Sequence, residues 1–75
     1  MRIDDEMRAA ARMLTDSTGV QRLFDEIELH YLRMARDATD NEAEEREAMM
    51  LARGLQVFRR RVAAVAAENR ENDDE

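Results

Sequence analysis

The chain has 75 residues, a net charge of −6 at pH 7, no cysteine and no proline. Its length allows one domain with a small core, and the absence of cysteine excludes disulfide bonds and thiolate metal sites. The negative charge opposes nonspecific binding to nucleic acid or to an anionic membrane surface. No apolar run approaches the ~20 residues that span a bilayer, and the N-terminus is too acidic for a signal peptide, so we expect a cytoplasmic protein without membrane contact.

The composition predicts an all-α fold. Alanine, leucine, glutamate, arginine and methionine dominate, and glycine occurs only at positions 19 and 54. These common residues are all good helix formers. A chain of this size buries only roughly 60% of its unfolded surface and is marginally stable alone. We therefore expect the helices to complete their core by homo-oligomerisation.

The first predicted helix spans about residues 4–14. Its apolar residues alternate at spacings of four and three, as on one face of a helix, and they are Ile3, Met7, Ala10 and Leu14. Acidic residues at positions 4–6 suit the positive end of the helix dipole. The stretch TDSTG that follows is rich in capping residues, and Thr18 with Gln21 fits a capping box for the next helix.

The second predicted helix spans about residues 19–38. An apolar seam recurs along it at helical spacing, and its members are Val20, Phe24, Ile27, Tyr31, Met34 and Ala38. Leu29 and Leu32 lie off this seam and form a second apolar strip that one partner helix cannot cover. These two leucines are therefore candidate interaction residues.

The third predicted helix spans about residues 40–68. Thr39 fits a capping box at its start, with Asn41 as the alternative. The main apolar seam consists of Ala48, Leu51, Leu55, Phe58, Val62 and Val65. The short turn before this helix predicts an antiparallel hairpin with the second helix. Residues 1–67 are thus expected to form a single helical domain, followed by an acidic disordered tail at residues 68–75.

The third helix carries a further apolar strip and an interior glycine. Met50, Val57 and Ala64 recur every seven residues, so Met50 and Val57 are also candidate interaction residues. A glycine in a helix interior costs roughly 1 kcal/mol relative to alanine. The hairpin places Gly54 near Phe24, and we expect close approach of a ring or another helix there. Gly54 is therefore included among the candidate interaction residues.

Three arginines, Arg46, Arg53 and Arg60, also recur every seven residues and share one face of the third helix. One interpretation is that they bind an anion, either a small phosphorylated ligand or an acidic protein surface, because arginine pairs well with phosphate and carboxylate groups. The other is a solvated, ion-paired helix flank. The pattern favours the flank, because the hairpin brings Asp25, Glu26 and Glu28 opposite the region of Arg53.

No catalytic, cofactor-binding or metal-binding site is predicted. His30 is the only histidine, and no set of metal ligands has a recognised spacing. The acidic residues 42–47 lack the turn glycine of a calcium loop, and no base is placed to activate Ser17. We expect neither an enzyme nor a cofactor. Nucleic-acid binding through a helix-turn-helix is disfavoured, because the second helix continues into the carboxylate-rich stretch FDEIE.

Three stretches, RLFDEIELHYLRMARDAT, DNEAEERE and ARGLQVFRRRV, follow the short first helix. This pattern, over about residues 7–67, resembles short helical proteins encoded among phage and prophage genes. The resemblance implies a role in virion assembly, or an accessory protein that binds a host factor in the bacterial cytoplasm. We expect a non-enzymatic protein-interaction module acting through a homo-oligomeric helix bundle. The alternative is an oligomeric anti-defence or regulatory protein that binds a small phosphorylated ligand or host factor through Arg46, Arg53 and Arg60.

Overall fold

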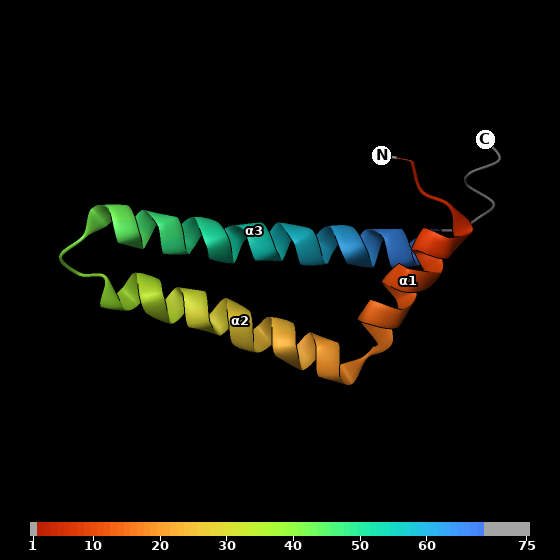
Figure 1. Ribbon diagram of the computed structural model, residues 1–75, viewed down its shortest axis with the longest axis horizontal. Coiled ribbons are helices and arrows are strands. Elements are labelled where there is room, and N and C mark those ends of the chain that lie inside the picture. The colour runs from red at the N-terminus through yellow and green to blue at the C-terminus, as the bar shows by residue number, and fades with distance from the viewer. Residues whose placement is uncertain (1, 69–75) are drawn as a thin grey trace.

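Three helices make up the part of the chain that the computed structural model describes, residues 2–68. They are α1 (Asp5–Asp16), α2 (Thr18–Asp37) and α3 (Glu42–Ala67). α2 and α3 lie side by side as an antiparallel hairpin, and α1 crosses its open end next to the C-terminus of α3 (Figure 1). Residues 2–68 contain no strand. The predicted all-α hairpin with a short N-terminal helix is confirmed, whereas most of the predicted tail, residues 69–75, lies outside the described residues.

Capping side chains set the start of each helix. Each N-cap side chain accepts a hydrogen bond from the backbone N–H three residues on: Asp4 from Met7 at 2.8 Å, Ser17 from Val20 at 3.2 Å, and Asn41 from Glu44 at 3.1 Å. Ser17 also donates its backbone N–H to the Met13 carbonyl oxygen, so one residue ends α1 and starts α2. The predicted cap at Thr18 is therefore one residue late. For α3 the structure selects Asn41, because Thr39 lies in the turn.

The helices meet through small side chains. The buried apolar residues are Ala11, Ala35, Ala48, Ala52 and Val65. Ala48 and Ala52 are each 1% exposed and lie one turn apart on α3. Alanine lets two helix axes approach closely, but it removes little apolar surface from water. Within residues 2–68 no large side chain is fully buried, so the core is small.

The larger apolar side chains lie at the rim of this core. Leu51 and Phe58 were predicted as core residues, yet they are 42% and 51% exposed. The predicted seam residues Ala48 and Val65 are buried, as expected. At four other positions the residue directly after a predicted seam residue takes the more buried place, in the pairs Ala10 and Ala11, Met34 and Ala35, Leu51 and Ala52, and Phe58 and Arg59. The predicted seams are therefore wrong at these positions. The physical reason is that alanine fits the narrow space between helices, whereas leucine or methionine does not.

The molecule is close to a single layer of helices. Its principal dimensions are 53 × 26 × 13 Å, so its thickness is half of its width and about a quarter of its length. The chain exposes 6167 Å², whereas a compact monomer of 8.7 kDa exposes about 4,700 Å². Domains normally bury their apolar stripes between two packed layers. Within residues 2–68, twelve large apolar side chains are at least 36% exposed, so much apolar surface is left uncovered.

Candidate interaction surfaces

The contact that joins the middle of α2 to α3 is polar and centres on Arg59. Arg59 Nη1 lies 2.8 Å from Asp25 Oδ1 and 3.6 Å from Glu28 Oε1, and Arg59 Nη2 donates a hydrogen bond to Gln21 Oε1 at 3.1 Å. The arginine side chain is 24% exposed and Asp25 is 66% exposed. These carboxylates were predicted to face Arg53. Arg59 takes that place because it lies on the inward side of α3, whereas Arg53 is exposed.

Two phenylalanine rings pack beside this polar contact. The ring centroids of Phe24 and Phe58 are 6.1 Å apart and the rings are nearly perpendicular, at 89°, which is a favoured aromatic arrangement. The guanidinium carbon of Arg59 lies 5.6 Å from the Phe24 ring centroid, a cation–π contact. Polar and aromatic contacts therefore fix the same register of the hairpin, while much of the Phe58 ring stays exposed.

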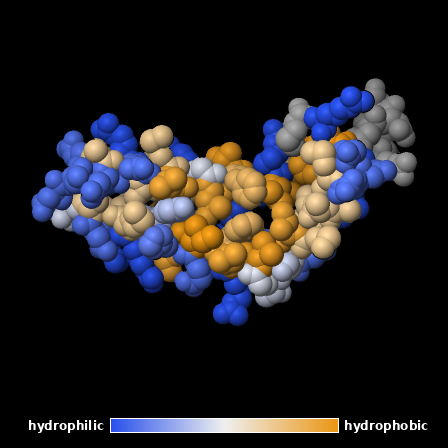
Figure 2. Space-filling view, in the orientation of Figure 1, coloured by the Kyte–Doolittle hydropathy of each residue, from blue (hydrophilic) through white to orange (hydrophobic). Residues whose placement is uncertain are grey.

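Apolar residues recur along one side of each helix of the hairpin. On α2 they are Leu23, Ile27 and Met34, and on α3 they are Leu51, Gly54 and Phe58, all at helical spacings of three, four or seven. Met34 and Leu51 line the same shallow hollow, so both strips lie on one side of the hairpin. We call these residues the apolar face. Figure 2 shows apolar side chains gathered over the middle of the molecule, between the polar loop end and α1.

α1 closes the apolar face at one end. Val65 lies seven residues after Phe58 and therefore on the same side of α3, yet Val65 is buried and Phe58 is not. α1 packs in this region, and Arg12 Nε donates a hydrogen bond to the Ala66 carbonyl oxygen at 3.1 Å. The open part of this side of α3 therefore ends before Val65.

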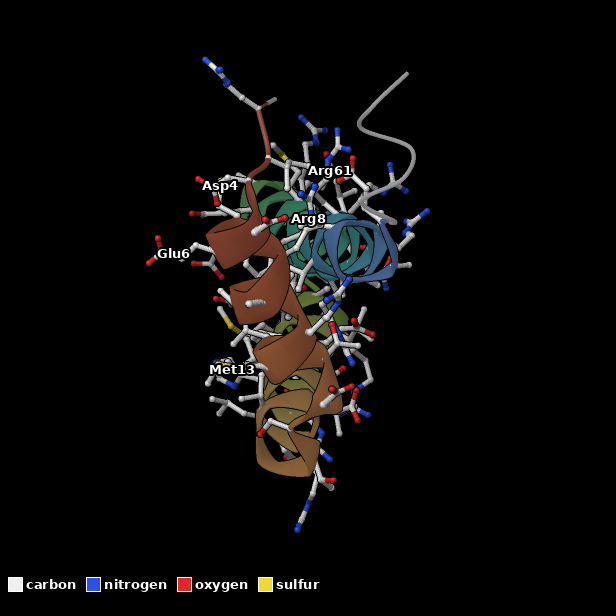
Figure 3. All side chains as sticks on the ribbon, turned by 90° about the vertical axis from the view of Figure 1, so that its right-hand side faces the viewer. Asp4, Glu6, Arg8, Met13 and Arg61 are labelled. Carbon is white, nitrogen blue, oxygen red and sulfur yellow. The ribbon has the colours of Figure 1, made fainter. Side chains whose placement is uncertain are left out.

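A buried arginine lies in the contact between α1 and α3. Arg8 is buried, and its Nη2 lies 2.7 Å from Asp5 Oδ1 in the preceding turn. Figure 3 shows Arg8 directed toward α3, whereas Asp4, Glu6 and Met13 lie on the other side of α1. The sequence offered no signal for this role, because Arg8 is one of many charged residues flanking an apolar seam.

The structure separates the predicted interaction residues. All of them, Leu29, Leu32, Met50, Gly54 and Val57, are exposed. Leu29 and Leu32 lie on the side of α2 that carries the contacts to Arg59, and Met50 and Val57 lie on the outer side of α3. Only Gly54 belongs to the apolar face. A Cβ atom at Gly54 would meet nothing within 4 Å, so the expected close approach of Phe24 within one chain is wrong.

Sequence reasoning missed most of the apolar face because it assigned those residues to the core. Met34, Leu51 and Phe58 all lay in the predicted seams. The available signal was the alanine directly after two of them, Ala35 and Ala52, which indicates an inward face made of small residues.

The outer side of α3 carries the arginine stripe, Arg46, Arg53 and Arg60. All three are exposed, and among residues 2–68 none of them makes an ion pair or a side-chain hydrogen bond. The Asp25 and Glu28 carboxylates, which were expected to pair with this stripe, contact Arg59 instead. The stripe is thus solvated but not paired across the hairpin.

The three arginines do not converge on one point of the chain. Seven helical residues advance the axis by ~10.5 Å, so the stripe extends over ~21 Å. Arg46 shares a shallow hollow with Glu42 and Glu45, and Arg60 shares another with Glu28. Carboxylates beside the arginines oppose the binding of a phosphate group. An elongated anionic partner fits this stripe better than one small ligand held by a single chain.

The other residues that were considered for metal binding or catalysis, His30 and Ser17, make contacts within the fold. The His30 ring lies against Tyr31, with centroids 5.8 Å apart, and the Ser17 hydroxyl caps α2. Residues 2–68 hold no group of three histidine, cysteine, aspartate or glutamate residues placed to bind a metal ion. In the same range, no helix has the length and apolarity needed to cross a bilayer.

Comparison of the chain with protein-family models, curated proteins and solved structures finds no match. Function must therefore be inferred from the surfaces themselves.

Proposed function

We propose that this protein is a non-enzymatic helical interaction module that works as a homo-oligomer, in which the apolar face of one copy packs against that of another. The resemblance to phage and prophage proteins suggests its setting, as an accessory or virion-assembly protein in the cytoplasm of a bacterial host cell. In that setting the assembled bundle presents its remaining helix surfaces to a further protein.

The observation that carries this proposal is the uncovered apolar surface of a thin molecule. The chain exposes 6167 Å², about 1,400 Å² more than a compact monomer of its mass. A standard stable interface buries about 800 Å² per partner. The apolar side chains that such an interface would cover are well exposed in the single chain: Leu23 is 57% exposed, Met34 45%, Leu51 42% and Phe58 51%.

A second copy is the partner that best completes this fold. The apolar face is bordered by charged residues, such as Arg33 and Glu47 in the hollow beside Met34 and Leu51, and an apolar centre with a polar rim is typical of an interface between protein chains. Stacking two single-layer molecules on this face creates the two-layer architecture that a single chain lacks. Two surfaces then remain outside the interface between the copies. They are the polar side of α2, which contacts Arg59, and the arginine stripe.

Sedimentation equilibrium and native mass spectrometry of the purified protein test this proposal. Two leucine variants form a matched pair, because Leu51 in the apolar face is 42% exposed and Leu29 outside it is 39% exposed. We expect Leu51→Glu to yield monomers and Leu29→Glu to retain the assembly. A wild-type protein that stays monomeric at high micromolar concentration would refute the proposal. If both variants lost the assembly equally, the apolar face would be excluded as the surface through which the copies associate.

A second candidate function is favoured by the unpaired arginine stripe. In this alternative the oligomer binds a phosphorylated ligand or an acidic host factor through Arg46, Arg53 and Arg60. Native mass spectrometry of protein purified from cells would detect a retained ligand or partner. The double variant Arg53→Gln with Arg60→Gln should then lose it at unchanged helix content, and retention of the ligand by this variant would exclude the stripe.

A further inference from the structure

One side of α3 carries five residues in a self-complementary order. At spacings of four, three, four and three they are Glu47, Leu51, Gly54, Phe58 and Arg61. This spacing places them along one seam of the helix, as in a coiled coil. Read from either end toward the middle, the seam has a charged residue, then a large apolar residue, then glycine.

The order of this seam matches an antiparallel copy of itself. A two-fold axis through Gly54 pairs residues that are equally distant from it in opposite directions. Glu47 of one copy then faces Arg61 of the other, because both lie seven residues from Gly54. Leu51 and Phe58 lie three and four residues from Gly54, so they come nearly, though not directly, opposite each other. A parallel pairing would instead oppose glutamate to glutamate and arginine to arginine.

No close contact within the single chain accounts for a glycine at position 54, where it lowers the stability of the helix. It lies in the middle of α3 and is exposed, and an added Cβ would meet nothing within 4 Å. Glycine destabilises a helix interior by roughly 1 kcal/mol relative to alanine. The absence of a side chain would favour a second helix crossing at this point, because two backbones can approach more closely at glycine than at any other residue.

The charged residues at the two ends of the seam are available for pairing. Glu47 and Arg61 are both exposed, and among residues 2–68 neither forms an ion pair. Beyond Arg61 the seam ends at Val65, which is buried where α1 packs against α3. The open segment therefore runs from Glu47 to Arg61, with Gly54 at its midpoint.

We propose that two copies of this chain associate through an antiparallel contact between their α3 helices, crossing at Gly54, with Glu47 of each copy paired to Arg61 of the other. This inference rests on the proposed homo-oligomer and specifies its geometry. The arginine stripe of α3 is unsuited to such a contact, because an antiparallel copy of the stripe through Arg53 opposes Arg46 to Arg60 and Arg53 to itself.

Cysteine crosslinking tests the crossing point, because the chain has no cysteine of its own. A disulfide forms only where two Cα atoms come within about 4.4–6.8 Å. Gly54→Cys places one thiol at the proposed crossing. Ala63→Cys is the matched control, because Ala63 is exposed and lies nine residues on, on the opposite side of α3. Under mild oxidation we expect Gly54→Cys to form covalent dimers at least about tenfold faster than Ala63→Cys.

Charge reversal tests the pairing of the two ends. Glu47→Arg and Arg61→Glu should each weaken self-association by about tenfold, because each creates like-charge contacts twice in a two-fold interface. The double variant with both changes restores opposite charges and should recover nearly wild-type association. Arg60→Glu makes the same charge change on another side of α3 and should leave association unchanged. Circular dichroism confirms that every variant keeps its helix content.

The outcomes separate this geometry from the broader proposal. Fast crosslinking at residue 54 together with rescue by the double charge variant supports the antiparallel contact. An oligomer in which residues 54 and 63 crosslink at equal rates, or in which the double variant is weaker than both single variants, overturns this contact and leaves the homo-oligomer standing. A wild-type chain that is monomeric at every concentration overturns both.

Discussion

Replacing Arg59 with alanine is expected to destabilise the hairpin by about 2 kcal/mol. Hydrogen bonds to charged groups contribute about 1.5–3 kcal/mol, and a cation–π contact adds about 0.5–1 kcal/mol. The upper part of this range does not apply, because Asp25 is 66% exposed and solvent weakens exposed ion pairs. Arg60 is the matched control, because it is exposed and surface substitutions away from such contacts usually change stability by less than about 0.5 kcal/mol.

Thermal and urea unfolding followed by circular dichroism at 222 nm measures this difference. For a domain of this size, 1 kcal/mol shifts Tm by roughly 4–8 °C, so Arg59→Ala should unfold at a Tm about 8–16 °C below that of Arg60→Ala. Both variants must be compared at one protein concentration, because association adds to apparent stability. Equal unfolding of the two variants would refute the role of Arg59 as the contact that holds α2 to α3.

Three further predictions concern the core, a cap and the glycine. Ala52→Leu should cost about 1–3 kcal/mol, because position 52 is 1% exposed and has no space for a larger side chain, whereas Ala63→Leu at an exposed position should be neutral in the same unfolding assay. Ser17→Ala should lower the free energy of unfolding by about 1 kcal/mol, because it removes the N-cap of α2. If Thr18→Ala destabilised the chain more than Ser17→Ala does, the cap would be at Thr18 instead. Gly54→Ala should raise the stability of the monomeric chain by up to about 1 kcal/mol and weaken its self-association, as measured by dilute thermal unfolding and sedimentation equilibrium; stronger association would contradict the proposed crossing.

The helices and their order followed from sequence because the signals for them are local. Capping side chains, helix-forming residues and the turn near Asn41 act over three or four positions, and each lies within a single stretch of chain. Errors were confined to neighbouring candidates, such as Ser17 and Thr18, where both residue types are good caps. Such ambiguity is resolved only when the path of the preceding helix is known.

Hydrophobic periodicity located the inward face of α3 only in part: Ala48 and Val65 of the predicted seam are buried, whereas Leu51 and Phe58 are not. In α3, the seam containing Leu51 and Phe58 and the adjacent one containing Ala52 and Arg59 have the same helical spacing. Periodicity ranks the first seam higher because its residues are more apolar. At these two turns the structure turns Ala52 and Arg59 inward, because the width of the gap between α2 and α3 favours alanine and because Arg59 finds two carboxylates on α2. Both causes depend on residues far away in sequence.

The candidate surfaces were predicted only in part for the same reason. Exposure of Met50, Val57 and the arginine stripe follows from positions on α3 that no predicted partner helix could cover, and each is exposed. Exposure of Leu51 and Phe58 depends on which seam faces inward. The significance of Gly54 likewise required the structure, because the empty space around it is a property of the folded chain.

The alanine-based core has a consequence for how this chain responds to temperature. The heat capacity of unfolding rises with the apolar surface that unfolding newly exposes, by about 0.45 cal/K/mol per Å². Side chains such as Leu51 and Phe58 are already half in contact with water in the folded chain. Unfolding one chain should therefore have a small heat-capacity change and a flat stability curve. In the proposed oligomer, most of the heat-capacity change would belong to dissociation, so cooling would separate the copies before it unfolds their helices.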